Sequence, residues 1–163
     1  MIPPQAKNAG AQVLRRATVE ELEALYVGAG PVRIPRGYFI GSHLEQLEKS
    51  WRRPIIRFAE KVGFQWLPFG VDFDSRRWFF VKKSVQIGAF DACLQSSVWR
   101  NTQVVALHYQ RSHLPKPIRR LLYDEVVPLG PDLCLGLGGV RVGGKPCEQF
   151  FFILERGGCH HRL

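Results

Sequence analysis

The stretch Leu122–Arg156, LYDEVVPLGPDLCLGLGGVRVGGKPCEQFFFILER, decides the fold. Its apolar runs are rich in β-branched and aromatic residues, which suit a pleated and half-buried surface. Turn residues separate the runs: Pro128–Asp132 follows the first, and Gly143–Gly144 is a strong two-residue hairpin signal before the last. The strands expected here are Leu121–Val127, Leu133–Leu137, Val140–Val142 and Cys147–Leu154.

The same texture extends toward the N-terminus as far as Phe69, where Phe69, Val71 and Phe73 alternate with smaller or polar residues. About seven strands joined by turns, and not by helices, indicate an antiparallel meander. Such a sheet hides its edges best by closing. We therefore expect a mainly β protein with a closed antiparallel meander barrel, and a sandwich is the alternative. Further expected strands are Tyr38–Ile40, Trp78–Val81, Val85–Leu94 and Gln103–Gln110.

Helical signals precede the strands. Thr18 and Glu21 form a capping box, in which each side chain can bind a backbone N–H at the helix start, and Gly28 is a natural stop. Ser42 and Glu45 repeat the capping-box spacing and predict a second helix. One or two short helices are therefore expected ahead of the barrel.

The length of 163 residues favours a single domain. Hydrophobic residues make up 45% of the chain, enough for a core of useful size. We expect a flexible leader over residues 1–16, one barrel domain with its helical part over residues 17–156, and a flexible tail over residues 157–163.

The net charge of +9 would attract nucleic acid, an anionic membrane surface or an acidic small molecule. The arginines form dispersed pairs, however, and a nucleic-acid-binding arm would be more clustered. The four cysteines contain no C-x-x-C pair, so the spacing does not support a zinc site. The sequence shows no signal peptide and no apolar stretch long enough to span a bilayer, and we expect a cytoplasmic protein.

Two stretches carry a family resemblance. In Val19–Leu44 a short helix is followed by Pro35–Gly41, and in Leu122–Arg156 the Asp124–Glu125 pair leads through a Pro-Gly turn and a Gly hairpin into the last strand. This order resembles small, largely uncharacterised bacterial proteins with a lipocalin-like (calycin) barrel. Tyr38 stands where some of these families have Trp, and Cys134 stands where an aromatic residue is usual. The resemblance implies a barrel with a lumen but no defined reaction. Nitrobindins, which are calycin-like, hold haem through a histidine, but no residue of this sequence aligns to that ligand.

Asp124 and Glu125 are adjacent on a strand, so only one of them can face a lumen. The pKa of a desolvated carboxyl rises, which suits a general acid or base. An ion pair with Arg119, Arg120 or Arg141 is the structural alternative. The residues expected to contact a ligand are Asp124, Glu125, His108, Tyr109, Asp91, Tyr38, Trp78 and Trp99.

The leading hypothesis is non-catalytic binding of a small hydrophobic or amphipathic ligand, whose headgroup an arginine could meet if it is anionic. The second is a lumenal isomerase, cyclase or lyase that uses Asp124 or Glu125 with His108 or Tyr109. The third is charge-driven binding of nucleic acid or an anionic membrane. No cofactor and no metal site are expected, because Cys159–His161 alone cannot complete a tetrahedral site.

Overall fold

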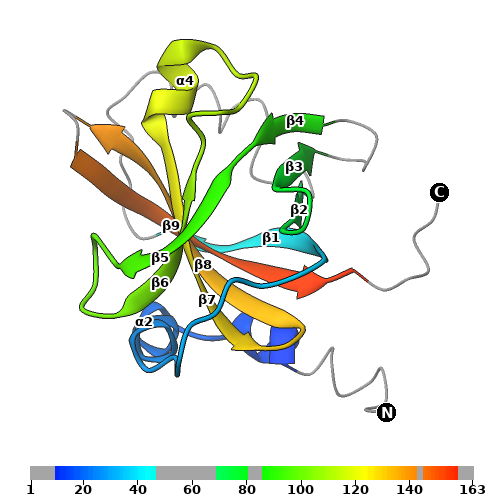
Figure 1. Ribbon diagram of the computed structural model, residues 1–163. Helices are drawn as coiled ribbons and strands as arrows, with labels where there is room; N and C mark the ends of the chain where they lie inside the picture. The colour runs from blue at the N-terminus through cyan, green and yellow to red at the C-terminus, as the bar shows by residue number, and fades with distance from the viewer. Residues whose placement is uncertain (1–9, 47–68, 81–85, 143–144, 158–163) are drawn as a thin grey trace.

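The computed structural model describes residues 10–46, 69–80, 86–142 and 145–157. Within these ranges nine strands form one antiparallel sheet in the order β4-β3-β2-β1-β9-β8-β7-β6-β5, which curls into a nearly closed barrel (Figure 1). The strands are β1 (Tyr38–Gln46), β2 (Phe69–Asp72), β3 (Arg77–Phe80), β4 (Gln86–Ala89), β5 (Asp91–Ser96), β6 (Gln103–His108), β7 (Leu122–Gly130), β8 (Leu133–Val142) and β9 (Lys145–Arg156), and the helices are α2 (Val19–Val27) and α4 (Lys116–Leu121).

The barrel closes at two places, one between distant strands and one within a continuous segment of chain. β1 pairs with β9, with Phe39 opposite Arg156. β4 pairs with β3 and β5 pairs with β6, and only Phe90 separates β4 from β5. β4 and β5 are therefore two segments of one bent strand that changes partners at Phe90. Counted this way, the nine strands occupy eight positions of an up-and-down meander, as the turn chemistry predicted.

Aromatic and aliphatic side chains pack together on the inner face of the barrel. Edge-to-face contacts connect Phe39 to Phe73 (ring centroids 5.6 Å apart) and Phe73 to Phe90 (5.7 Å). Such pairs add to the stabilisation that apolar burial already provides. We call these buried residues the inner cluster: Phe39, Val71, Phe73, Phe90, Ala92, Val105, Leu107, Tyr109, Val126, Cys134, Phe152 and Leu154.

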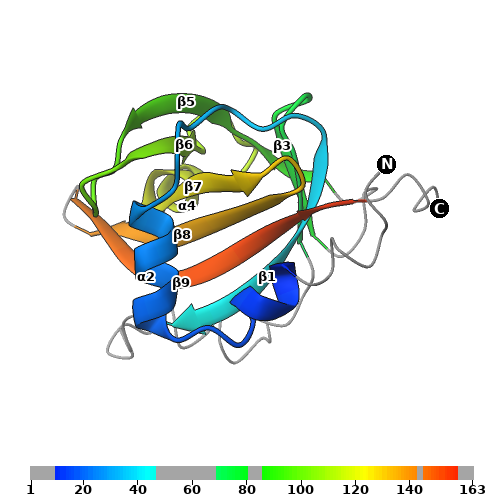
Figure 2. The same ribbon diagram turned by 90° about the horizontal axis from the view of Figure 1, so that it is seen from below.

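A second cluster lies outside the barrel, where α2 crosses β8 and β9 (Figure 2). Thr18 caps α2 and forms the predicted capping box with Glu21. The apolar face of the helix buries Leu22 and Tyr26, and the Tyr26 ring meets Phe151 edge to face at 6.2 Å. The helix therefore covers the outer face of the sheet and does not close an end of the barrel. The outer cluster is Ala11, Leu14, Leu22, Tyr26, Val104, Val127, Leu135, Leu137, Phe151 and Ile153.

The second predicted helix does not begin at Ser42, and residues 47–68, over which it was expected to continue, lie outside the described residues. Ser42 lies inside β1, which runs from Tyr38 to Gln46, so the Ser42–Glu45 spacing does not cap a helix. β1 hydrogen-bonds to β2 on one edge and to β9 on the other, and this pairing outweighs the local helical signal. The short strand predicted at Tyr38–Ile40 is thus the beginning of a longer one.

Two further elements differ from the sequence expectations. Residues 10–14 are helical and bury Ala11 and Leu14, whereas a flexible leader was expected as far as Arg16. Only turns were expected between the strands, whereas the short helix α4 lies between β6 and β7 and runs directly into β7. The expected segments Leu133–Leu137 and Val140–Val142 are one strand, β8.

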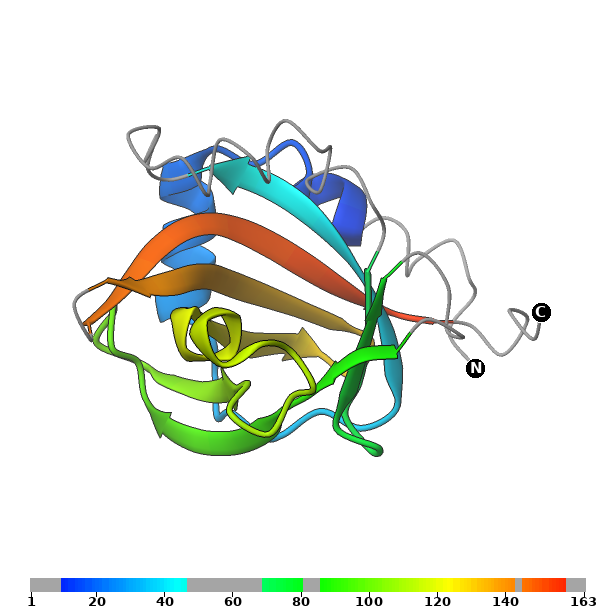
Figure 3. The same ribbon diagram turned by 90° about the horizontal axis from the view of Figure 1, so that it is seen from above.

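The two ends of the barrel differ. In a meander successive strands run in opposite directions, so β1, β3, β6 and β8 end on the side of the barrel that carries α4 (Figure 3). We call it the α4 end. At the opposite end, the Arg156 guanidinium lies 5.1 Å from the Phe39 ring centroid, pairs with Asp132 at 2.7 Å and bonds to the Pro131 carbonyl. This Arg156 end is sealed by charged and aromatic groups together.

Two glycines of β8 make room for rings inside the barrel. A Cβ atom at Gly136 would lie 2.2 Å from the Phe152 ring, and one at Gly138 would lie 2.3 Å from the Phe150 ring. These positions must therefore lack a side chain for the rings to lie flat against the sheet.

Replacing Gly136 by alanine should lower the free energy of unfolding by about 1–3 kcal/mol, because the buried Phe152 ring has to move. Urea denaturation measures the change. Gly130→Ala is the matched control on β7, because a Cβ there meets nothing within 4 Å. Equal stability of the two variants would contradict this packing.

Candidate functional site

β7 separates its two carboxylates onto opposite faces of the sheet. Successive strand residues point to opposite sides, and Val126 belongs to the inner cluster whereas Val127 belongs to the outer one. Asp124 therefore faces the barrel interior, and Glu125 faces outward beneath α2. Of these two adjacent carboxylates, Asp124 is therefore the one that can face a lumen.

Asp124 forms a dyad with Tyr109, which lies just beyond the end of β6. The Tyr109 hydroxyl donates a short hydrogen bond to Asp124 Oδ2. Burial raises the pKa of Asp124 to about 6, and the charge of Glu125 adds to the rise, whereas the Tyr109 hydroxyl and the Gly139 backbone amide oppose it. Burial and then the Asp124 charge raise the pKa of Tyr109, so the phenol remains a donor. We call this pair the inner dyad.

Aromatic rings surround the inner dyad. The Trp78 ring meets Tyr109 edge to face at 5.8 Å, and Phe90 lies 6.4 Å from it. On the other side, the space at Gly138 is shared by the Phe150 ring and Asp124 Oδ1, which would lie 2.3 and 3.0 Å from a Cβ atom there. The carboxylate thus lies between rings, and Asp124 as a whole residue is partly buried.

His43 is an inward-facing residue that the sequence analysis missed. It follows Phe39 and Gly41 on the inner face of β1, and its ring lies 4.4 Å from Phe150 and 6.1 Å from Phe69. Burial lowers the pKa of His43, which keeps the imidazole neutral near neutral pH. The alternation of Phe39 and Gly41 would have revealed it if Ser42 had not been assigned to a helix.

Inward-facing side chains are graded in exposure along the barrel. Toward the Arg156 end they are fully buried: Phe39, Val105, Val126, Cys134 and Leu154 are each 0% exposed. Toward the α4 end Leu107 and Tyr109 are buried as well, but several other inward-facing side chains are only partly buried. The more exposed inward-facing side chains therefore lie mainly at the α4 end. Its partly buried side chains are His43, Phe69, Trp78, Leu122, Asp124 and Phe150.

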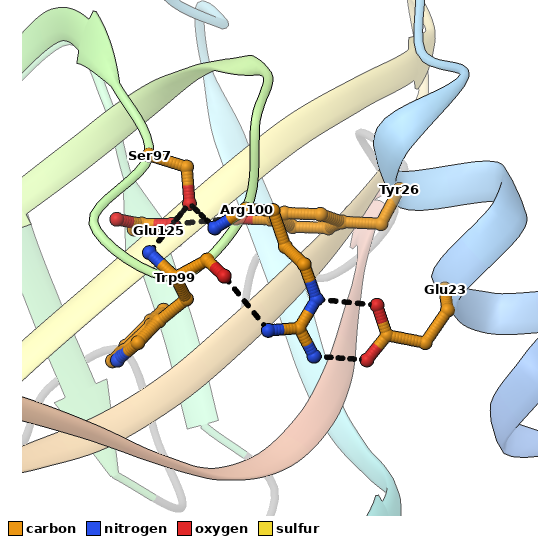
Figure 4. Close-up of polar contacts among 6 residues, drawn as sticks. All are labelled: Glu23, Tyr26, Ser97, Trp99, Arg100 and Glu125. Atoms are coloured by element: carbon orange, nitrogen blue, oxygen red, sulfur yellow. Dashed lines mark hydrogen bonds and ion pairs between the residues drawn. The ribbon is translucent and has the colours of Figure 1, made fainter.

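Glu125 holds together three outer elements (Figure 4). Its carboxylate is 0% exposed and accepts hydrogen bonds from the hydroxyls of Tyr26 (2.9 Å), Ser97 (2.6 Å) and Tyr123 (2.9 Å), and from the Val98 backbone amide (2.8 Å). Burial and the Glu125 charge raise the pKa of Tyr26, so this hydroxyl stays a donor. A buried carboxylate is costly unless it is satisfied in this way, so Glu125 has a structural role.

The hairpin between β5 and β6 is fastened to α2 by a second contact. Arg100 forms a bidentate ion pair with Glu23, in which Nε lies 2.6 Å from Oε2, and its Nη1 donates to the Trp99 carbonyl (Figure 4). The Ser97 hydroxyl also accepts from the backbone amides of Trp99 and Arg100. The helix, the hairpin and β7 therefore form one polar clamp outside the barrel.

His108 lies on the outer face, away from the inner dyad. Its ring is 5.4 Å from the Tyr123 ring, and its Nε2 is 3.4 Å from the Gln95 amide oxygen. Tyr109, the next residue, faces inward. The predicted combinations of Asp124 with His108, and of Glu125 with Tyr109, are therefore not formed, whereas Asp124 with Tyr109 is.

The remaining predicted residues divide between the two faces. Asp91 lies outside, paired with Arg111 at 3.2 Å and Arg76 at 3.8 Å. Tyr38 lies outside against Phe79, and Trp99 packs with the outer cluster. Of the eight predicted contacts, Asp124, Tyr109 and Trp78 face the interior, whereas Glu125, His108, Asp91, Tyr38 and Trp99 do not.

Comparison with known proteins bears on the fold. A crystal structure of a protein from Thermomonospora curvata is similar over 94% of this chain and 99% of that chain, with a TM-score of 0.50 and 16% sequence identity. At this identity the match shows a shared barrel fold alone. No protein-family model and no curated protein sequence matches the chain.

The described residues offer neither a metal site nor a membrane-spanning helix. No group of three or more His, Cys, Asp or Glu side chains within those ranges could hold a metal ion. Cys159–His161 lie outside the described residues. None of the helices in the described ranges is long and apolar enough to cross a bilayer.

The clamp predicts graded losses of stability. Tyr26→Phe should lower the free energy of unfolding by about 1 kcal/mol, the net value of one hydrogen bond. Glu125→Ala should lower it by about 3–5 kcal/mol, because it strands several buried donors at once. Urea denaturation measures both, and Glu20→Gln, on the exposed side of α2, controls for the loss of one negative charge. A Glu125→Ala variant as stable as Glu20→Gln would contradict this role.

Asp124 should make stability depend on pH. Its pKa is about 6 in the folded protein, above the ordinary value of 3.8 for an aspartic acid in water. The folded state therefore binds more protons between these values, and the free energy of unfolding falls as pH rises through that window. Asp124→Asn cannot titrate, so its stability relative to wild type should improve from about pH 4 to about pH 6.5. Urea denaturation across this range tests the prediction, and parallel stability curves for the two proteins would refute it.

Proposed function

We propose that the protein binds one small hydrophobic or amphipathic molecule in the α4 end of the barrel and does not alter it chemically. The gradient of exposure carries this proposal: the interior is sealed at the Arg156 end and partly accessible at the α4 end. The accessible part combines rings with a few polar groups, which is the usual composition of a small-molecule site.

The fold supports the same proposal. Eight strand positions in an up-and-down barrel are the arrangement found in lipocalins, whose interior has room for one small ligand. We therefore propose a lipocalin-like relationship beyond the barrel itself. We also propose a bacterial origin, which the neighbour from Thermomonospora curvata supports, and a cytoplasmic location, with which the free thiols of Cys93 and Cys134 agree.

Charge-driven binding is less well supported. Several of the described arginines are engaged with carboxylates: Arg15 with Glu155, Arg100 with Glu23, and Arg156 with Asp132. The large apolar side chains that are exposed among the described residues are aliphatic, whereas binding of single-stranded nucleic acid uses exposed aromatic rings.

Catalysis is a second candidate, which the inner dyad favours. With His108 and Glu125 outside, a lumenal enzyme would use Asp124 as the base and Tyr109 as the donor. Incubation of an identified ligand with the protein, followed by chromatography and NMR of the recovered molecule, separates the two candidates, because an isomer has the same mass as its precursor. Binding alone returns the ligand unchanged, whereas an isomerase, cyclase or lyase converts it.

Blocking the α4 end should abolish ligand binding. Leu122 faces inward directly after α4, so Leu122→Trp would fill the accessible interior. We expect it to weaken binding of a fluorescent apolar probe by at least about tenfold. Leu25→Trp, at an exposed position of α2, is the matched control and should bind like wild type. Native mass spectrometry of the purified protein gives an independent reading of bound ligand.

The same experiment can refute the proposal. If wild type binds no apolar probe, or if Leu122→Trp and Leu25→Trp bind equally well while both stay folded by circular dichroism, the interior is not a ligand site.

A further inference from the structure

We infer that the polar end of the ligand is a hydrogen-bond donor that carries positive charge, an amine on an apolar body, and that Asp124 receives it between the rings of Trp78, Tyr109 and Phe150. This inference rests on the proposed function, because it concerns the same interior site. It favours a headgroup of the opposite charge to the anionic one that the sequence analysis raised as an alternative.

The charge inside the barrel points to a cation. Among the inward-facing side chains that the structure describes, Asp124 is the one carboxylate, and the inward-facing arginine, Arg156, is at the opposite end and bound to Asp132 and Pro131. His43 at the α4 end is kept neutral by burial. Among the inward-facing side chains described, a fatty-acid carboxylate at this depth would meet the like charge of Asp124 and no cation, whereas an ammonium group would meet its counter-ion.

The geometry of the inner dyad leaves capacity for a ligand. An ionised carboxylate offers roughly four acceptor positions and donates nothing. The Tyr109 hydroxyl occupies one position and the Gly139 backbone amide another. The positions that remain accept from a donor, which an amine supplies and a carboxylate does not.

The rings add a second attraction for the same group. Trp78 and Tyr109 form an edge-to-face pair on one side of Asp124, and Phe150 lies against Gly138 on the other. The faces of aromatic rings attract cations, most strongly where water is displaced. A carboxylate flanked by rings therefore favours an organic cation over a neutral alcohol of the same length.

The test compares three probes that share one alkyl chain: dodecylamine, dodecanol and dodecanoate. Each is titrated into the full-length protein by competition with a fluorescent apolar probe near neutral pH. Dodecylamine should bind at least about tenfold more tightly than dodecanoate. A difference of this size is typical of a modest charge–charge contact. Asp124→Asn should lose this preference while still binding dodecanol, Asp124→Glu should keep it, and Asp74→Asn, an exposed carboxylate at the other end, should behave as wild type.

Dependence on pH gives a separate readout. Amine affinity should rise between about pH 5 and about pH 7 in wild type, as Asp124 ionises, and should stay level in Asp124→Asn.

The possible results separate this inference from the proposed function. Dodecanoate binding as tightly as dodecylamine, or an amine preference that survives in Asp124→Asn, overturns the inference while ligand binding stands. Failure of all three probes to bind wild type overturns both.

Discussion

A strand that is buried on both faces has no solvent-facing side for a carboxylate, and β7 carries two in succession. Period-two alternation sends Asp124 into the barrel and Glu125 under α2. Each charge needs its own partners because burial without them is costly. The phenol of Tyr109 serves the inner carboxylate, and donors from α2, the β5–β6 hairpin and β7 serve the outer one. Both the attachment of the helix and the character of the interior follow from this division.

The two carboxylates accept different numbers of hydrogen bonds. This difference suggests a structural role for Glu125 and a ligand contact for Asp124. Glu125 accepts four hydrogen bonds and is inaccessible, so its place is to hold elements together. Asp124 has fewer donors, a raised pKa and partial exposure. A polar group left incompletely satisfied among apolar rings is a natural contact for a ligand. The sealed Arg156 end leaves the α4 end as the accessible side.

The sequence could name several residues of the candidate site, but it could not say which of them lie together. The sequence singled out Asp124, Tyr109 and Trp78, which do lie together in the interior. It also placed His108 with them, because a strand pattern shows that neighbours face opposite ways but not which way is inward. His43 was missed because a capping-box spacing hid the second half of β1, whose conformation depends on pairing with β2 and β9.

The sequence by itself determined the mainly β class, the meander, the hairpin signal before β9 and the first helix with its capping box. These depend on local properties: side-chain period, turn residues and caps. Only the tertiary structure decided that β1 pairs with β9, that the strand bends at Phe90, that α2 lies outside the barrel, and which face of β7 is the interior. These depend on contacts between residues far apart in the chain, such as Tyr26 with Glu125, and no local pattern encodes which distant strand or helix a given face will meet.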